Sequence, residues 1–309
     1  MTSAVVFGYH NVGVRCLAVL LAHGIKIPLV VTHDDDPREN IWFGSVRRLA
    51  ELNQVPVVVP EDPNAPDFVA RIAALQPDFL FSFYFRFMLR APLLSLPRHG
   101  ALNMHGSLLP KYRGRVPVNW AIIHGERHTG ASLHYMAAKP DAGDLVDQQA
   151  VPILPDDIAL EVFNKVTMAA EIVLDRSLPA LIAGSAARVP LDLKAGSYFG
   201  RRTPEDGRID WSQPAVAVHN LIRAVAPPYP GAFSSAGGRR LRILRSHYAA
   251  EPARHPPPVL YVEAGRCYAD CGDGRRLQVV VLELGGVALD AERLVERYGD
   301  QPLPLGEQA

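Results

Sequence analysis

The sequence of 309 residues contains few cysteines, no excess of charge of either sign and no long uninterrupted apolar run. Three cysteines are too few for a disulfide framework, and Cys267 and Cys271 have no second Cys or His pair at zinc-binding spacing. The apolar N-terminal run lacks a basic leader, and the most apolar long stretch, residues 79–96, is broken by two arginines and a proline. These absences predict a cytoplasmic protein with no membrane association and no metal site.

The charge balance and composition exclude further classes of protein. Lysine plus arginine and aspartate plus glutamate both number 32, which gives a formal net charge of zero and a pI near 7.2. This balance gives no sign of a nucleic-acid-binding surface. A hydrophobic fraction of 48% and a charged fraction of 21% are those of an ordinary globular protein. At roughly 150 residues per domain, the length predicts about two domains.

Apolar runs and helical patterns alternate in the first hundred residues. The runs typical of strands are 4–7, 27–33, 56–60 and 78–85, and the helical patterns between them are 15–24, 45–52 and 68–75. Continuous apolar strands separated by helices are typical of a parallel sheet that is covered on both faces. We therefore expect an α/β fold with a Rossmann-like, mainly parallel sheet and helices on both of its faces.

The pattern changes after residue 100. A strand over 101–105 and a polar loop precede two more strand-like runs, and apolar residues at helical spacing predict a long helix over Ala159–Ile182. Residues 185–204 have the composition of a linker, and short β-rich runs follow from 231 to 284. These features predict a first domain over 1–200 and a small β-rich barrel or sandwich over 201–309.

Gly8 and Gly13 follow the first strand, where nucleotide-binding loops often occur. The segment GYHNVGV lacks the G-x-G-x-x-G pattern and the Lys-Ser/Thr of a P-loop, so a dinucleotide dehydrogenase is disfavoured. The favoured interpretation is a strand-to-helix turn with glycines for close packing. A ligand phosphate approaching the helix N-terminus remains the alternative.

Asn103 and His105 lie two residues apart in ALNMH and share one face of the predicted strand. An amide and an imidazole side by side at the carboxyl end of a strand can hold a carbonyl oxygen that becomes an oxyanion. Asp141, after the strand ASLHYM, is the carboxylate that could return to this edge and orient the imidazole. Taken singly, each of the three is more typical of a satisfied surface or capping residue, and only the trio together makes the catalytic interpretation equally good.

The loop SLLPKYRGRVP carries three cations, Lys111, Arg113 and Arg115. It is either a solvated loop or a lid that contacts an anionic substrate such as a diphosphate. Arg201 and Arg202 could add to the same pocket.

The motif NMHGSLLPKYRGR, followed by P-x-N-W and then by D-A-G, resembles the folate-dependent formyltransferases. These enzymes transfer a formyl group from 10-formyltetrahydrofolate to an amine. The resemblance implies that Asn103, His105 and Asp141 are the catalytic residues. It also implies a Rossmann-like domain followed by a small OB-like domain.

Further segments, FSFYFR, FGRRTPEDG and HNLIRAVAPPYPGAF, are similar to the formyltransferase domain of the bifunctional enzymes that act on UDP-4-amino-4-deoxy-L-arabinose in lipid A modification and polymyxin resistance. This similarity runs from Ala4 to about Tyr248, with Tyr229 where a tryptophan is expected. It implies a nucleotide-sugar substrate and 10-formyltetrahydrofolate as donor. The cofactor residues that it implies are Phe87, Met88, Leu89, Ala137, Ala138, Lys139, Pro140 and Asp141, with Phe85 beside them. The substrate residues that it implies are Ser107, Lys111, Arg115 and Arg201.

The bifunctional enzymes carry an additional decarboxylating dehydrogenase after this domain, for which 309 residues leave no room. The resemblance therefore implies a separate decarboxylating dehydrogenase in the same pathway, or a related aminosugar as acceptor.

Methionyl-tRNA formyltransferase is the main alternative within the family. From residue 200 onward the sequence has 14 arginines, no lysine and 13 acidic residues, a surplus of one positive charge. This small surplus disfavours tRNA binding, as Arg115 also does, although the cluster Arg239, Arg240, Arg242 and Arg245 keeps that alternative open. The second domain disfavours a phosphoribosylglycinamide formyltransferase, and the intact trio disfavours a non-catalytic binding domain.

Overall fold

The computed structural model describes residues 1–256 and 258–306. The chain folds into two compact units that interleave along the sequence. The first unit consists of Met1–Pro117, Thr129–Val151 and Asn164–Gly200, and the second consists of Val118–His128, Pro152–Phe163 and the chain from Arg201 onward. A boundary between separate domains at residue 200 stays a prediction.

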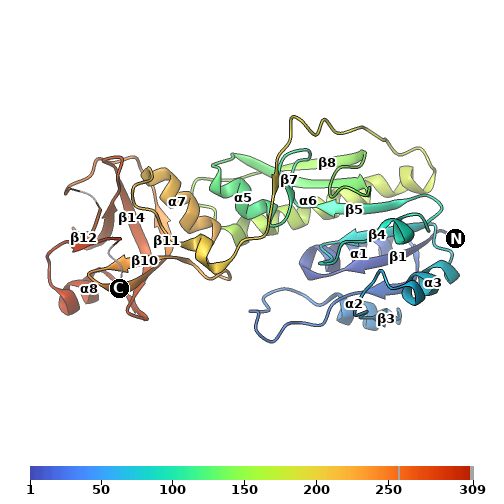
Figure 1. Ribbon diagram of the computed structural model, residues 1–309, viewed down its shortest axis with the longest axis horizontal. Helices are drawn as coiled ribbons and strands as arrows, with labels where there is room; N and C mark the ends of the chain where they lie inside the picture. The colour runs from blue at the N-terminus through green and yellow to red at the C-terminus, as the bar shows by residue number, and fades with distance from the viewer. Residues whose placement is uncertain (257, 307–309) are drawn as a thin grey trace. The chain divides into compact units, whose positions relative to one another are not determined.

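A seven-stranded sheet forms the centre of the first unit (Figure 1). Its spatial order is β3 (Val57–Val58), β2 (Lys26–Val31), β1 (Ser3–Gly8), β4 (Phe79–Phe83), β5 (Ala101–His105), β7 (His128–Tyr135) and β8 (Leu145–Pro152). The pairs from β3 to β5 are parallel, and β5 pairs with β7 in antiparallel orientation. The mainly parallel sheet expected from the continuous apolar runs is therefore confirmed.

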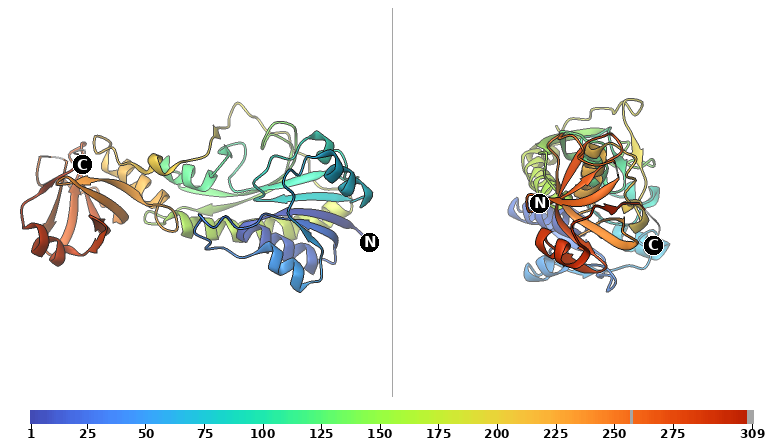
Figure 2. Two further views of the ribbon diagram at one scale, coloured as in Figure 1. Left: turned by 60° about the horizontal axis from the view of Figure 1, so that its bottom comes forward. Right: turned by 90° about the vertical axis from the view of Figure 1, so that its left-hand side faces the viewer.

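Along each strand, side chains alternate between the two faces of the sheet, so apolar strands present apolar side chains on both faces. Helices cover both of these faces. The helices that belong wholly to this unit are α1 (His10–Ala22), α2 (Val46–Leu52), α3 (Pro66–Ala74) and α4 (Ala91–Leu94). Val5 and Phe7 of β1 share a buried cluster with Phe68 and Ile72 of α3. Helix α1 contacts β1 and β4, and its Leu17 is buried. Figure 2 shows the helices running along the sheet.

The long helix α6 (Ala159–Ile182) has the bounds that its apolar spacing predicts. Its residues from Asn164 onward belong to the first unit, where Val166 and Val173 are completely buried. The described part of the chain contains no helix that is both long and apolar enough to cross a membrane.

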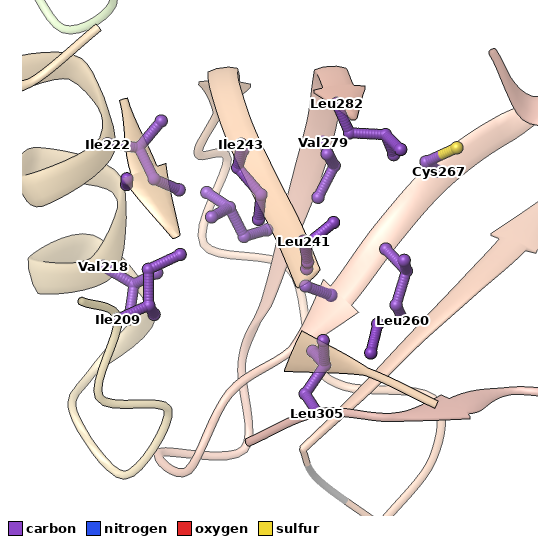
Figure 3. Packing of buried hydrophobic residues seen from close by; sticks show 14 of the residues in the cluster. Ile209, Val218, Ile222, Leu241, Ile243, Leu260, Cys267, Val279, Leu282 and Leu305 are labelled. Atoms are coloured by element: carbon purple, nitrogen blue, oxygen red, sulfur yellow. The ribbon is translucent and has the colours of Figure 1, made fainter. Parts of the chain in front are cut away.

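The second unit is a mainly antiparallel, near-barrel β structure, as expected for a small OB-like domain. Its path of strands is β10 (Ala232–Ala236), β11 (Arg239–His247), β14 (Arg276–Leu284), β13 (Arg266–Asp270), β12 (Val259–Glu263) and β16 (Leu303–Pro304), with β15 (Val287–Leu289) paired to β14. The helices and the 3-10 turn of this unit are α5 (Pro117–Ile123), η1 (Pro204–Gly207), α7 (Ala215–Ala224) and α8 (Ala291–Tyr298). Its core packs α7 against the strands through Val218, Ile222 and Leu241 (Figure 3).

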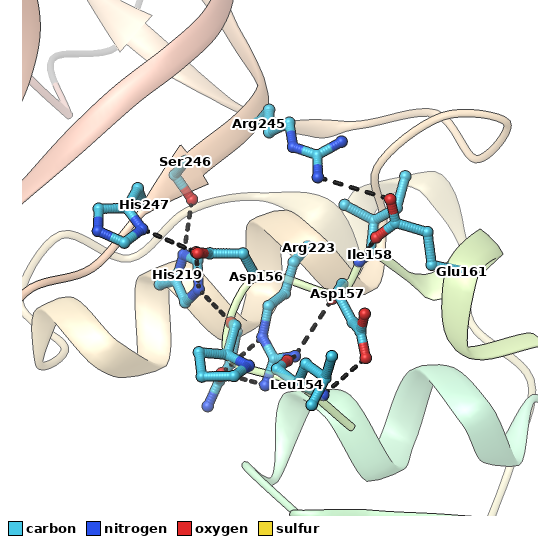
Figure 4. Close-up of polar contacts among 12 residues, drawn as sticks. Leu154, Asp156, Asp157, Ile158, Glu161, His219, Arg223, Arg245, Ser246 and His247 are labelled. Atoms are coloured by element: carbon cyan, nitrogen blue, oxygen red, sulfur yellow. Dashed lines mark hydrogen bonds and ion pairs between the residues drawn. The ribbon is translucent and has the colours of Figure 1, made fainter. Parts of the chain in front are cut away.

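A polar network joins residues 152–163 to this second unit (Figure 4). The buried His219 of α7 donates Nε2–H to Pro155 O at 2.9 Å and accepts from Ser246 Oγ at 2.9 Å. The buried Arg223 donates to the carbonyl oxygens of Leu154 and Asp157 at 3.3 and 3.2 Å. These bonds satisfy buried polar groups, so the segment folds with the second unit although it lies far from α7 in sequence.

Residues 185–204, expected as a linker, contain a short strand of the first unit. In this segment β9 (Tyr198–Phe199) pairs in parallel with β6 (Arg113–Gly114) of the cationic loop. A two-residue strand has too few positions to show a periodic pattern, which is why the composition alone indicated a linker.

Candidate active site

Asn103 and His105 lie on β5, and Asp141 lies in the loop that follows β7. The Nδ1 atom of His105 is 3.6 Å from Asp141 Oδ1, and the Asn103 amide donates to the same oxygen across 3.4 Å. His105 is 6% exposed, so this group of polar side chains is largely removed from water. The structure thus brings the three residues together at the carboxyl end of β5.

His134 is a fourth polar side chain beside Asn103 and Asp141, and it is not among the residues expected from the sequence. It is opposite Asn103 in the β5–β7 pair, 1% exposed, with Nε2 3.2 Å from Asn103 Nδ2 and 3.5 Å from Asp141 Oδ1. Its Nδ1 lies 2.8 Å from Tyr135 O, so the backbone carbonyl fixes the orientation of the ring. The available signal was a histidine in the apolar run ASLHYM.

The Asp141 carboxylate is held ionised by its neighbours. Burial alone would raise the pKa of Asp141, but the adjacent His105 and His134 and the Gly114 N–H outweigh burial and hold this pKa well below its usual range. The Gly114 N–H donates to Asp141 Oδ2 at 2.9 Å. The carboxylate can therefore orient the His105 ring, whose Nδ1 lies 3.6 Å from Asp141 Oδ1.

The loop after β5 is built by its own hydrogen bonds. Tyr112 O accepts from His105 Nε2 at 2.8 Å, which fixes a proton on that nitrogen. The Ser107 hydroxyl, which is completely buried, donates to Lys111 O at 2.7 Å. Ser132 of β7 donates to Ser107 O at 2.6 Å. Ser107 therefore holds the loop in shape, and its expected contact with a substrate stays a prediction.

Gly114 is required by the pairing of this loop with β9. Its φ of +97° lies in the region that favours glycine. A Cβ atom at residue 114 would lie 2.2 Å from Phe199 O. The Arg115 N–H donates to the same oxygen at 2.9 Å. The close approach of residues 198–199 thereby sets the direction of the Gly114 N–H toward Asp141.

Comparison with known proteins identifies this arrangement. Residues 6–178 match the family described as formyl transferase, and residues 201–299 match the formyl transferase C-terminal domain. The chain belongs to the formyl transferase family.

Solved structures show the same fold at low sequence identity. An N-formyltransferase from Helicobacter canadensis, in complex with folinic acid and dTDP-3-aminofucose, is 20% identical with a TM-score of 0.69, over 90% of this chain and 99% of that chain. WlaRD, a sugar 3N-formyl transferase solved with dTDP and 5-N-formyl-THF, is 20% identical with a TM-score of 0.71, over 90% and 97%. HypX from Aquifex aeolicus, in complex with tetrahydrofolic acid, is 18% identical with a TM-score of 0.62, over 94% of this chain and 46% of HypX.

The cations of this formyltransferase loop differ in exposure. Lys111 and Arg115 are exposed, and within residues 1–256 and 258–306 no carboxylate forms an ion pair with Arg115. Arg113 is only 6% exposed, and its Nε and Nη1 atoms have no hydrogen-bond partner in the described residues. Arg201 is exposed and belongs to the second unit, so its assignment to the substrate stays a prediction.

The segment expected to hold the folate follows β4. Phe87 and Met88 are 45% and 51% exposed, whereas Leu89 is buried in the core. Asn64 brackets the segment, since its amide donates to Met88 O at 3.0 Å and its carbonyl accepts from the Arg90 N–H at 2.8 Å. The segment is therefore fixed by its backbone, and two apolar side chains remain exposed to solvent.

The second segment expected to contact folate precedes Asp141. Ala137, Ala138 and Lys139 are exposed, and Pro140 is half-buried. Among the described residues, no group of three or more His, Cys, Asp or Glu side chains could hold a metal ion.

Gly8 and Gly13 serve close packing in this fold. A Cβ atom at Gly13 would lie 2.8 Å from the Val46 side chain and 3.2 Å from the backbone of Gly8. Between them, His10 stacks on Phe43 with ring centroids 3.9 Å apart, and burial lowers the pKa of His10 to about 3. His10 is therefore neutral at physiological pH and adds no positive charge to this turn, and a ligand phosphate at the helix N-terminus stays a prediction.

Proposed function

We propose that this protein transfers a formyl group from 10-formyltetrahydrofolate to the amino group of a nucleotide-linked aminosugar. The observation that carries the proposal is the buried group of Asn103, His105 and Asp141 beside a loop with an exposed arginine, Arg115. Family membership supports the formyl transfer. The relatives solved with folinic acid and dTDP-3-aminofucose, or with dTDP and 5-N-formyl-THF, support the folate donor and the class of acceptor.

The proposed reaction begins when the neutral sugar amine attacks the formyl carbon. The carbonyl oxygen becomes an oxyanion, which the Asn103 amide and His105 stabilise. At 3.4 Å from Asp141, the Asn103 N–H is at the limit of a hydrogen bond, so it can turn to the oxyanion at little cost. The bond between the formyl carbon and N10 of the folate then breaks, and the amine proton ends on N10.

His105 and Asp141 manage the protons of this reaction. Because Nε2–H donates to Tyr112 O, Nδ1 is the nitrogen that can hold or release a proton on the Asp141 side. Asp141 stays ionised, orients the imidazole and accepts the proton of the attacking amine, directly or through water, before that proton passes to N10 of the folate. His134 holds the side chains of Asn103 and Asp141 in their positions relative to one another.

For the acceptor itself we propose UDP-4-amino-4-deoxy-L-arabinose. Its diphosphate would lie against Arg115, whose side chain no described carboxylate engages. It would also lie against Arg113, whose buried Nε and Nη1 atoms have no hydrogen-bond partner within residues 1–256 and 258–306. The folate would contact Phe87 and Met88.

The arginine cluster of the second unit argues against tRNA as acceptor. Arg239 lies over the Tyr298 ring and Arg240 over the Phe233 ring. Arg242 pairs with Glu283 at 2.6 Å. The ion pairs of Arg242 with Glu283 and of Arg245 with Glu161 offset two charges of the cluster, which leaves less net positive charge to bind phosphates.

The test is formyl transfer from 10-formyltetrahydrofolate, followed by mass spectrometry, with UDP-4-amino-4-deoxy-L-arabinose, dTDP-3-aminofucose and methionyl-tRNA offered in parallel. One added formyl group on a sugar nucleotide alone supports the proposed class, and the reacting sugar decides the acceptor. Formylation of the tRNA alone would overturn it. In the same assay, Asn103→Ala should reduce kcat by roughly 10²–10³-fold, because one oxyanion donor is lost.

A further inference from the structure

A second cleft lies at the opposite end of β5 from Asn103 and His105. Its volume is about 310 Å³, within the range of small-ligand sites. The residues that line it are Pro97, Arg98, His99, Gly100, Tyr135, Leu181, Gly184, Ala186 and Arg188. Gly100 directly precedes β5 and His105 ends it, so roughly 13–17 Å of strand separates this cleft from the catalytic edge.

Arg188 is preorganised on one wall of the cleft. Its guanidinium lies over the Tyr135 ring, 3.7 Å from the ring centroid. In the described part of the chain no carboxylate pairs with it. A guanidinium held flat on a ring keeps its N–H donors directed outward in its own plane, where they match an oxoanion.

Gly100 provides the space for this stack. Its φ is +112°, and a Cβ atom there would lie 3.0 Å from Tyr135 Cε1 and 4.0 Å from an Nη atom of Arg188. A Cβ atom at residue 100 would therefore crowd the Tyr135 ring, whereas its distance to Arg188 is an ordinary contact. Gly100 thus leaves the ring in the place where the exposed Arg188 stacks on it.

The charges around the cleft leave a surplus of basic groups. Arg98 pairs with Asp78 at 3.3 Å, and Asp78 also accepts from the Ser3 N–H at 2.9 Å. His99 adds a ring that packs on Phe79 with centroids 5.3 Å apart. The negative charge of Asp78 therefore offsets the positive charge of Arg98. The positive charge of Arg188, which lines the cleft together with His99, is not offset by a described carboxylate.

The end of α6 borders the same cleft and presents little negative potential to it. The carbonyl oxygens of Pro179, Ala180 and Leu181 accept from the backbone N–H groups of Ala183, Ser185 and Gly184. With these carbonyls satisfied, the helix C-terminus opposes an anion only weakly.

We propose that this cleft binds a small metabolite through an oxoanion, a phosphate or a carboxylate group, with Arg188 as its main ligand and His99 beside it. The Tyr135 ring supports the arginine and offers an apolar wall to the rest of the molecule. This site is independent of the formyl-transfer site and does not depend on which acceptor the enzyme uses.

The test is isothermal titration of the full chain with inorganic pyrophosphate and, separately, with tricarballylate. We expect both anions to bind the wild type, and the tighter one identifies the phosphate or carboxylate chemistry of the natural ligand. Arg188→Gln should weaken binding roughly ten- to a hundredfold, because a charge-assisted hydrogen bond is lost. Arg188→Lys should retain part of the affinity, since it keeps the charge without the planar donors.

Two control variants assign the binding to the cleft. Arg115→Gln alters the cationic loop of the proposed active site, and Arg71→Gln removes an exposed arginine of α3. Arg71→Gln should not change pyrophosphate binding, and Arg115→Gln should remove only a separate contribution from the proposed active site and leave the contribution that Arg188→Gln removes. Equal binding by wild type and Arg188→Gln, loss of binding in Arg115→Gln alone, or no binding of either anion up to about 10 mM would each overturn the proposal.

A second pair of variants tests whether the Tyr135 ring positions Arg188, and it leaves the charge of Arg188 unchanged. Tyr135→Phe retains the ring and should bind pyrophosphate as the wild type does, whereas Tyr135→Leu removes the ring and should bind it several-fold more weakly. Equal affinities for the two variants would contradict the role given to the stack. Thermal unfolding of each variant shows whether it is folded.

Discussion

The backbone N–H of Gly114 donates to the Asp141 carboxylate across 2.9 Å and thereby links two loops that lie on opposite sides of β7 in the sequence. The first loop carries the cations Lys111, Arg113 and Arg115, and the second carries the acidic member of the proposed catalytic trio. Because Gly114 also lies against Phe199 O, the orientation of Asp141 depends on a segment almost sixty residues away. A side chain at residue 114 should therefore act on catalysis and not only on stability.

We expect Gly114→Ala to lower kcat by roughly tenfold or more, with a smaller effect on KM. The Cβ atom would have to move Phe199 O or rotate the Gly114 N–H away from Asp141, and a lost hydrogen bond to a charged group is worth about 1.5–3 kcal/mol. The measurement is steady-state formyl transfer. Gly24→Ala is the matched control, because Gly24 has a similar positive φ of +69° and open space around its Cβ position. Equal kcat values for the two variants would refute this role of Gly114.

Asp141→Asn should change how stability depends on pH. The pKa of Asp141 is depressed in the folded protein, so its charge stabilises the fold above the unfolded value of about 4, and this contribution is lost as the pH falls below that value. Wild type should exceed Asp141→Asn in unfolding free energy by a constant amount above about pH 5, and the difference should shrink toward pH 3. Urea unfolding at a series of pH values measures it, with the exposed Asp67→Asn as control. A difference that does not vary with pH would contradict this assignment.

His134 should support the reaction without contacting the substrate. His134→Phe keeps a ring in the buried site but removes the nitrogen beside Asn103 and Asp141, so the amide and the carboxylate lose a fixed neighbour. We expect kcat to fall roughly ten- to a hundredfold, as for the loss of one or two buried hydrogen bonds. His128→Phe, at the exposed start of the same strand, is the control and should be near wild type. An unchanged kcat in His134→Phe would show that Asn103 and Asp141 are held by other groups.

The three cysteines should be unreactive in the folded protein. Cys16, Cys267 and Cys271 are all free and buried. Burial raises the pKa of Cys267 to about 11 and that of Cys271 to about 12, and it also raises the pKa of Cys16. Because the thiolate is the reactive form, a thiol reagent at pH 8 should titrate none of them in the native state and all three in denaturant. Reaction of a native thiol would show that one of the two cores opens readily.

Local sequence pattern determined much of the fold. The strands β1, β2, β4 and β5 are apolar runs whose sheet partners are themselves apolar, and α6 has the bounds that its spacing predicts. The spacing of Asn103 and His105 was sufficient to place both on one face of a strand. The apolar character of a run and the spacing of its apolar residues are local properties, so both can be read from a single sequence.

The tertiary structure decided the composition of the site. His134 joins the trio only because antiparallel pairing of β5 with β7 sets it opposite Asn103, and such a register depends on contacts across thirty residues. The segment 198–199 reaches the cationic loop in the same way, through a two-residue strand that has no periodic signal. Arg113 and Arg115 are two residues apart in one motif, yet one is buried and the other exposed. The sequence by itself therefore determined which residue types could do the chemistry, and long-range backbone pairing decided which of them meet.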